Sequence, residues 1–409
     1  MKYTRLNYLL SLIIISSFIV GFIFQENSSG GAIDFAHYYS NSKLFYYNNF
    51  FQIDWLKYES SSLPLYYLIT YFFFDPENLI LIKIFHIFLS ILCWFIFYKT
   101  LKNNLELGNS LALLLSSSIL LSPYFRTGTY WMMEENLPIL MTFLTIYFFL
   151  NLKKKFNYSF LVSAIFFSAC AFFSRQNYII ISFGLFLLIF DFKNIFSKKN
   201  LFIIFTYAIC FSPSIYFLIT WKGLLPPLLV EQDRTLIFNF QNIPHIMNIL
   251  LIYTVPFIYV DRKKILFFLN KNKILIISLF IFYLLLFYNF IPSNLGGGAI
   301  NKLLFMVSTG FVLKYLTLLF SFISFILLFT IFRDNKFILI YFVSNIILFC
   351  TITPVWQEYF DPLSLIIILL FGNKINSSVN SNRFVYFLIV YLTIFLSASI
   401  IDQNYLHNL

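Results

Sequence analysis

Residues 6–24 read LNYLLSLIIISSFIVGFIF, an apolar run without a charged side chain that follows Lys2 and Arg5. A helix needs about 20 such residues to cross the roughly 30 Å hydrocarbon core of a bilayer. The run is long for the apolar region of a signal peptide, and no clear small-x-small cleavage site follows it. We therefore predict a retained membrane-spanning helix whose amino-terminal end faces the cytoplasm.

Twelve further apolar runs continue this pattern along the chain. They lie at 78–98, 107–122, 136–151, 157–174, 177–190, 201–220, 244–260, 273–292, 303–331, 337–352, 362–371 and 384–401. The composition agrees, because only 11% of the 409 residues are charged, whereas a soluble domain carries about 25%. We predict an all-α, polytopic integral membrane protein with about 13 transmembrane helices, in which residues 1–409 form a single multi-pass domain.

The basic residues predict the orientation. If the amino terminus is cytoplasmic and each run crosses once, 19 of the 28 basic residues face the cytoplasm. They form clusters at the ends of apolar runs, such as Lys153–Lys155 and Arg262–Lys264. Such clusters orient membrane helices, so the net charge of +11 does not indicate nucleic acid binding. Thirteen of the 17 acidic residues lie on the outer side, and because acids hardly affect topology we treat them as candidates for site residues.

The first predicted outer loop, residues 25–63, is the longest polar stretch. The apolar residues 64–74 that follow reach only about 16 Å as a helix. We predict a juxtamembrane or re-entrant helix there, because an extra crossing would place Lys153–Lys155 outside. Asp34 and His37 fall at helical spacing within the loop. Asp34 is either the N-cap of a short helix or a carboxylate that serves as a general base or a metal ligand.

Three short motifs fall on predicted outer segments. The first comprises Asp34, His37, Trp55 and Ser60–Tyr67, the second is Arg175-Gln176-Asn177, and the third is Glu358-Tyr359-Phe360-Asp361-Pro362. In this order they resemble motifs of the GT-C superfamily of polyprenyl-phosphate-sugar-dependent glycosyltransferases, and within it the Alg10/DIE2-like glucosyltransferase family. The Asp–His spacing is one residue shorter here, and the Thr of the family's Arg-Gln-Thr-Asn motif is missing.

The resemblance implies roles for the outer-side residues. Asp34 would be the catalytic base, and Glu134 or Glu135 matches a second acidic residue that GT-C enzymes carry in a later outer loop. The donor phosphate would be held by Arg175, Gln176, Lys302 and Arg234. The acceptor or the sugar would be bound by His37, Asn177, Gln357 and Glu358.

The residues by themselves leave alternatives open. Arg175 suits a phosphate because guanidinium binds two oxygens in a fork, or it is an interfacial arginine that extends to the headgroups. Glu134 and Glu135 raise one another's pKa or share a metal, or they are the acidic start of a helix. Gly296–Gly298 closes over the donor or forms a turn. Lys314 marks a water-filled cavity near mid-membrane, unless the run 303–331 begins above the bilayer.

We therefore expect an inverting membrane glycosyltransferase with its active site on the extracytoplasmic face, in a bacterial inner membrane. Its partners would be a polyprenyl-phosphate-linked sugar donor, a lipid-linked or cell-envelope glycan acceptor, and membrane lipids. No cofactor is certain, and a divalent metal (Mg²⁺ or Mn²⁺) held by Asp34 and Glu135 is an alternative. An O-antigen-type polysaccharide polymerase and a lipid-linked glycan flippase or transporter are the rival functions, although no internal repeat of the transporter kind is visible.

Overall fold

The computed structural model describes residues 2–48, 52–58, 60, 62–70, 74–223, 225–228, 237–293, 296–352, 354–372 and 381–403. Within these ranges every regular element is a helix, and none is a strand. The chain divides into two compact units. The first unit is Met1–Thr235 with Leu392–Leu409, and the second unit is Leu236–Tyr391.

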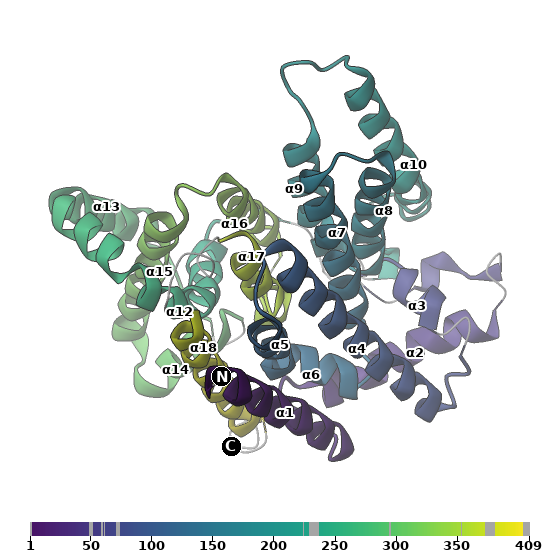
Figure 1. Cartoon of the computed structure of the whole chain (residues 1–409), viewed down its shortest axis with the longest axis horizontal. Coiled ribbons are helices and arrows are strands. Elements are labelled where there is room, and N and C mark those ends of the chain that lie inside the picture. The colour runs from purple at the N-terminus through teal and green to yellow at the C-terminus, as the bar shows by residue number, and fades with distance from the viewer. Residues whose placement is uncertain are drawn as a thin grey trace. The chain divides into compact units, whose positions relative to one another are not determined.

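The first unit contains the helices of the amino-terminal half of the chain (Figure 1). They are α1 (Lys2–Ile23), α2 (Gly31–Tyr47), η2 (Trp55–Lys57), α3 (Leu65–Thr70), α4 (Leu79–Asn104), α5 (Asn109–Ser117), η3 (Ser118–Leu121), α6 (Pro123–Tyr130), α7 (Asn136–Lys154), α8 (Tyr158–Ser174), η4 (Gln176–Tyr178), α9 (Ile179–Ile189) and α10 (Lys198–Trp221).

The second unit contains the later helices. They are α12 (Asn242–Lys271), α13 (Lys273–Leu286), α14 (Gly298–Val307), α15 (Gly310–Phe332), α16 (Lys336–Phe349), η5 (Gln357–Tyr359) and α17 (Leu363–Phe371). The last helix, α18 (Ser381–Ile401), begins in the second unit and ends in the first.

Seven helices among the described residues are long and apolar enough to cross a membrane, namely α1, α4, α7, α10, α12, α15 and α18. Shorter apolar helices cover the predicted runs at 107–122, 157–174, 177–190, 273–292 and 337–352. A bilayer admits helices because every backbone polar group must be satisfied within the segment. The prediction of an all-α membrane protein is confirmed at this level, whereas the count of 13 crossings stays a prediction.

Contacts within the first unit group the helix ends as alternating crossings require. At one end, the Asn7 side chain donates to Ser110 Oγ at 3.4 Å, which joins the starts of α1 and α5. The Tyr158 and Phe202 rings there lie 4.9 Å apart and join the starts of α8 and α10. At the other end, Nε1 of Trp221, the last residue of α10, donates to the Trp55 carbonyl at 3.0 Å. We call this second end, where the predicted outer loops meet, the outer end of the first unit.

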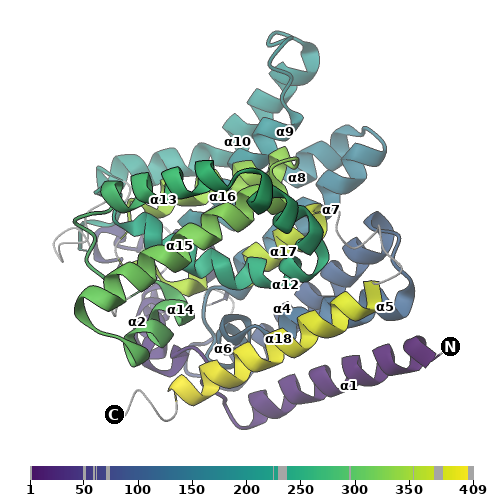
Figure 2. The same ribbon diagram turned by 90° about the vertical axis from the view of Figure 1, so that its left-hand side faces the viewer.

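The last helix, α18, ends close to the end of the first helix, α1. The ends of α1 and α18 meet, because the Ser399 hydroxyl donates to the Ser28 carbonyl. The carboxyl-terminal ends of α1 and α18 therefore lie close together (Figure 2), whereas the number of crossings stays a prediction.

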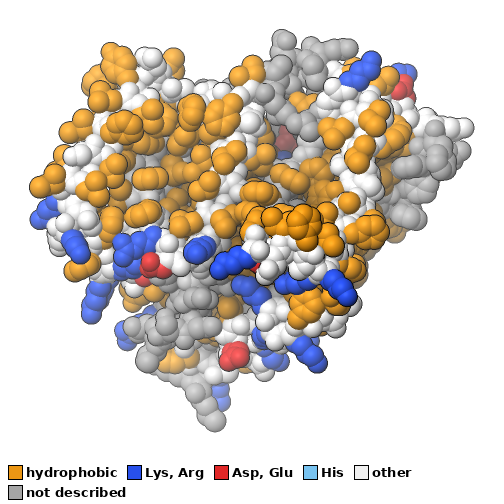
Figure 3. All heavy atoms as spheres, turned by 90° about the horizontal axis from the view of Figure 1, so that it is seen from above, with side chains coloured by type: hydrophobic (Ala, Val, Ile, Leu, Met, Phe, Trp, Pro, Cys, Tyr) orange, Lys and Arg blue, Asp and Glu red, His pale blue; other side chains and the backbone are white. Residues whose placement is uncertain are grey.

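Hydrophobic side chains cover much of the molecular surface (Figure 3). None of the residues of α13 is buried, although the helix is almost entirely apolar. In water so large an exposed apolar area would promote association. In a bilayer it is the surface that contacts lipid, so this exposure agrees with membrane embedding.

Two predicted boundaries need correction in the second unit. The predicted run 303–331 is interrupted after Val307, and α15 starts at Gly310. Lys314 therefore lies in the second turn of α15, and its ammonium group donates to the Tyr288 carbonyl. The run 244–260 extends as α12 to Lys271, because the charged segment after residue 260 remains helical. Charge did not end the helix since Arg and Lys are good helix formers.

The run 362–371 is also shorter than a crossing. Its helix α17 has nine residues and rises about 14 Å. All nine are buried, and Gln357 just before them is 3% exposed. The Gln357 side chain therefore lies inside the second unit, surrounded by protein.

Candidate active site

The site is built on the tight turn between α6 and α7. Pro123 occupies the first turn of α6, and the Ser122 hydroxyl caps the helix by accepting from Phe125 N at 3.0 Å. After α6 the chain reverses through Met132, whose φ of 54° is left-handed. Such a conformation costs a non-glycine residue about 1–3 kcal/mol and is concentrated at functional sites. This turn places Glu134 and Glu135 immediately before α7.

A hydroxyl from the juxtamembrane helix holds the turn in place. Tyr66 of α3 donates to the Met132 carbonyl at 2.5 Å, and the same hydroxyl lies 2.9 Å from Nε2 of His86 on α4. All three residues are buried. The described part of the segment 64–74 is thus a six-residue helix at the outer end of the first unit, too short to cross. Its position as a juxtamembrane or re-entrant element stays a prediction.

Arg175 binds both glutamates. Its Nη1 lies 3.0 Å from Oε1 of Glu135, and its Nε lies 3.6 Å from Oε1 of Glu134. Arg175 directly follows α8 with extended backbone (φ −156°, ψ 122°), which lets its side chain return to the start of α7. All three side chains are nearly buried, with 11% of Arg175 exposed. Two carboxylates share one guanidinium, so the group carries one formal negative charge.

These contacts bear on the interfacial-arginine and helix-start alternatives for the three residues. Arg175 does not extend freely into an interface, because it is engaged by carboxylates. Glu135 stands at the N-cap position of α7, but its side chain makes no cap hydrogen bond. The glutamates therefore serve the ion cluster rather than only the start of α7. We call Glu134, Glu135 and Arg175 the acidic–arginine cluster.

The first outer loop adds a neutral partner to this cluster. The Ser62 hydroxyl donates to Oε1 of Glu134, and the Tyr58 hydroxyl donates to the Ser62 carbonyl at 2.7 Å. Burial raises the pKa of Tyr58 well above its usual value, and the negative charge of Glu134 raises it further. Tyr58 and Ser62 thus fix the position of the Glu134 carboxylate.

Asp34 lies on α2, which begins against the same turn. A Cβ on Gly31 would come within 2.3 Å of Thr127 Cγ2 and 2.7 Å of Met133 Sδ, so glycine permits this close approach. Asp34 is in the first turn of α2 and is exposed. The N-cap interpretation is wrong, since Gly30 in the left-handed conformation occupies that position. His37 is within α2, and its side chain lies outside the described part of the structure.

Gln176 and Asn177 follow Arg175 as the first residues of η4. Asn177 is 9% exposed, and its Oδ1 has no hydrogen-bond partner within the described residues. Both residues therefore lie at the outer end of the first unit with the acidic–arginine cluster. Arg175, Gln176 and Asn177 thus lie with Glu134 and Glu135 at that end, and α2, which carries Asp34, begins against the same turn.

The remaining predicted residues are elsewhere. Arg234 lies outside the described residues. Lys302 lies in α14, and Glu358 lies in η5, both in the second unit. Gln357 is engaged there: its Oε1 accepts from Ala299 N at 2.8 Å, and its Nε2 lies 3.3 Å from the Tyr253 hydroxyl.

Gly296–Gly298 packs against this second-unit segment. All three glycines have positive φ, between 71° and 87°. Gly297 N donates to the Val355 carbonyl at 2.9 Å. The three glycines thus form a fixed turn in front of α14 rather than a loop without contacts.

The sequence did not single out a second ion pair beside the cluster. Arg126 of α6 binds Glu26 through Nε–Oε1 at 2.8 Å and Nη2–Oε2 at 2.6 Å, and only 2% of Arg126 is exposed. Gly21 makes room for it, because a Cβ there would lie 2.4 Å from Arg126 Nη2. The sequence feature that could have indicated this pair is an arginine among apolar residues, because a buried arginine needs a charged partner. Ser62 and Tyr66 lie within the Ser60–Tyr67 motif, but their contacts depend on packing.

No group of three His, Cys, Asp or Glu residues that could hold a metal ion occurs among the described residues. A metal held by Asp34 and Glu135 stays a prediction. The chain matches no protein-family model, no curated protein and no solved structure. The GT-C resemblance therefore still depends on its motif residues alone.

Proposed function

We propose that the protein is an inverting membrane glycosyltransferase that uses a polyprenyl-phosphate sugar. The observation that carries the proposal is the grouping of Asp34 with the acidic–arginine cluster at the outer end of the first unit. These residues come from three separate segments of the chain. Glycosyl transfer needs both a carboxylate base and a cation for the leaving phosphate.

The charge balance of the cluster suggests how the donor binds. Arg175 is shared by two carboxylates, and Glu134 keeps its hydrogen bond from Ser62 when the guanidinium moves. A phosphate offers guanidinium the same forked geometry as a carboxylate. We propose that the donor phosphate replaces Glu135 on Arg175, which leaves the Glu135 carboxylate available to the acceptor.

The reaction then requires one displacement. Asp34 accepts the proton of the acceptor hydroxyl while the acceptor oxygen forms a bond to the anomeric carbon. The bond from that carbon to the phosphate oxygen breaks, and the polyprenyl phosphate leaves with the electron pair beside Arg175. Attack opposite the leaving group inverts the anomeric configuration. The donor lipid remains in the bilayer throughout.

The test uses full-length protein in proteoliposomes with radiolabelled polyprenyl-phosphate hexoses and a lipid-linked glycan extract. We expect label in the glycan fraction, loss of at least 100-fold in rate for Asp34→Asn, and no change for Asp75→Asn. Asp75 is a matched control, because it is an exposed acid of the first unit outside the candidate site.

The outcomes separate the rival functions. Undiminished turnover in Asp34→Asn removes the proposed base. Label that moves across the membrane without a new glycosidic bond indicates a transporter. Products that grow by whole oligosaccharide repeats indicate a polymerase. Chelation of divalent ions in the same assay decides whether Mg²⁺ or Mn²⁺ takes part.

A further inference from the structure

The loop between α9 and α10 forms a pocket at the opposite end of the first unit from the acidic–arginine cluster. It is an open pocket of about 590 Å³ lined by Asp191, Lys193, Asn194, Ile195, Phe196, Ser197 and Lys199. Its size lies within the range of about 300–1,000 Å³ that small ligands occupy. The proposed glycosyl transfer uses none of these residues.

Internal hydrogen bonds fix the backbone of this loop. The buried Asn200 side chain donates from Nδ2 to the carbonyls of Asp191 and Asn194, at 2.7 and 2.8 Å. The Asp191 carboxylate accepts from Lys193 N and from Asn194 Nδ2, both at 3.0 Å. Because Asn194 and the backbone donate to Asp191, its pKa is lowered. The pocket is therefore preformed, and its one carboxylate is already bonded within the loop.

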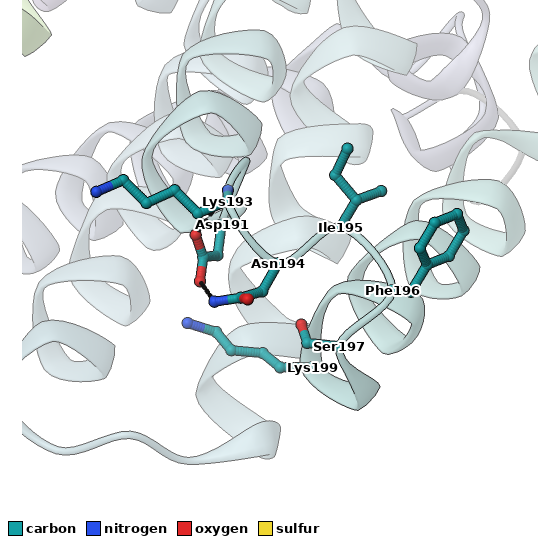
Figure 4. A pocket seen from close by; sticks show the side chains of 7 residues that line it. All are labelled: Asp191, Lys193, Asn194, Ile195, Phe196, Ser197 and Lys199. Carbon is teal, nitrogen blue, oxygen red and sulfur yellow. Dashed lines mark hydrogen bonds between the residues drawn. The ribbon is translucent and has the colours of Figure 1, made fainter.

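The pocket has a cationic side and an apolar side. Figure 4 shows the ammonium groups of Lys193 and Lys199 on one side and the side chains of Ile195 and Phe196 on the other. Ile195 is 49% exposed and Phe196 is 86% exposed. An aromatic side chain this exposed is unfavourable in water but suits the boundary between headgroups and acyl chains.

Positive charge accumulates at this end of the unit. Lys198 and Lys199 occupy the first turn of α10, which contains no acidic residue. Cations there oppose the helix macrodipole, whose amino-terminal end favours an anion. Lys199 Nζ also lies 5.2 Å above the Phe156 ring, beside Lys153–Lys155. A bound anion would relieve this accumulation of charge.

We propose that the α9–α10 loop is a binding site for an anionic phospholipid. The phosphate of the headgroup lies between Lys193 and Lys199 at the start of α10, and the acyl chain lies against Ile195 and Phe196. A soluble anion would use only the cationic side. The exposed apolar side chains therefore favour a lipid as the occupant, and the inference is independent of the proposed glycosyl transfer.

The experiment measures lipid binding to delipidated full-length protein in detergent by native mass spectrometry, with phosphatidylglycerol and phosphatidylcholine as probes. The Lys193→Gln/Lys199→Gln variant is compared with Lys263→Gln/Lys271→Gln. The control pair consists of exposed lysines that also lie on the predicted cytoplasmic side but in the second unit. Since two basic residues near a lipid surface together contribute about 2 kcal/mol, we expect the first variant to bind phosphatidylglycerol about 30-fold more weakly.

Phe196→Ser tests the apolar side without changing the charge. We expect weaker phosphatidylglycerol binding in this variant. From the wild-type protein, a millimolar excess of inorganic phosphate should not displace the lipid. All these side chains are exposed, so the variants should keep the wild-type melting temperature. Equal losses in the test and control pairs, unchanged affinity in the test pair, or complete displacement by phosphate would each overturn the proposal.

Discussion

Replacing Arg175 by Met tests the acidic–arginine cluster most directly. The change removes the guanidinium that lies 3.0 Å from Glu135 and 3.6 Å from Glu134, while Met keeps much of the apolar stem. Loss of one partner from a buried ion pair costs about 3–5 kcal/mol. Because 11% of Arg175 is exposed, water can reach the remaining charges. We therefore expect a loss of about 2–4 kcal/mol in the free energy of unfolding.

The loss in the free energy of unfolding should depend on how many charged carboxylates remain after Arg175 is removed. Glu134 keeps the Ser62 hydroxyl as a donor, so removal of the Glu135 charge relieves most of the repulsion. The double variant Arg175→Met/Glu135→Gln should therefore be more stable, by about 1–3 kcal/mol, than the summed effects of the two single substitutions predict. Arg175→Lys should fall between Met and wild type, because one ammonium group cannot reach two carboxylates in the geometry of a fork.

The assay is denaturant titration in mixed micelles, followed by tryptophan fluorescence. Arg262→Met is the matched control, since Arg262 is exposed and its loss should change stability by less than about 0.5 kcal/mol. If Arg175→Met is as stable as wild type, or if its effect is additive with that of Glu135→Gln, the cluster is not a coupled ion group.

Three further predictions concern the residues that support the site. Gly21→Ala should destabilise by about 2–4 kcal/mol in the same titration, because the added Cβ displaces the Glu26–Arg126 pair and this outweighs the helix propensity gain of about 1 kcal/mol. Gly108→Ala, with nothing within 4 Å of its Cβ, should change stability by less than about 1 kcal/mol, and equal effects of the two would contradict the steric argument. Tyr66→Phe should cost about 1–3 kcal/mol, since it leaves a buried carbonyl and a histidine nitrogen without this hydroxyl; a neutral result would show that the hydroxyl does not hold the turn. The raised pKa of Tyr58 favours its neutral form in the folded protein, so this stabilisation is complete below the unfolded value of about 10 and is lost as pH rises toward the folded value. Melting temperatures measured between about pH 8 and 11 should therefore fall less steeply for Tyr58→Phe than for wild type, and parallel curves would contradict the assignment.

Much of the fold follows from local properties of the chain. The run 6–24 and its counterparts become helices because a bilayer offers no partner for backbone polar groups. The segment 64–74 was recognised as too short to cross, and its described part is a helix at the outer end. The limits of α12 and α15 were not predictable in this way, because helix propensity and packing decide where a helix continues beyond its apolar part.

The candidate site was predictable as a set of residues but not as an arrangement. Charge and length placed Asp34, Glu134 and Arg175 on one side of the membrane, because basic clusters orient each crossing. Their mutual contacts arise from packing: α8 returns beside α7, and Met132 turns the chain so that the glutamates meet the arginine. Gly31 allows α2 to approach the same turn.

The sequence by itself determined that the protein is a helical membrane protein and which residues share its predicted outer side. Both properties depend on the transfer of side chains and backbone between water and lipid, which is nearly additive along the chain. The tertiary structure alone decided that Arg175 is shared by two carboxylates and that Arg126 is buried against Glu26. Such pairings join segments far apart in the sequence, and only close packing sets the distances at which they interact.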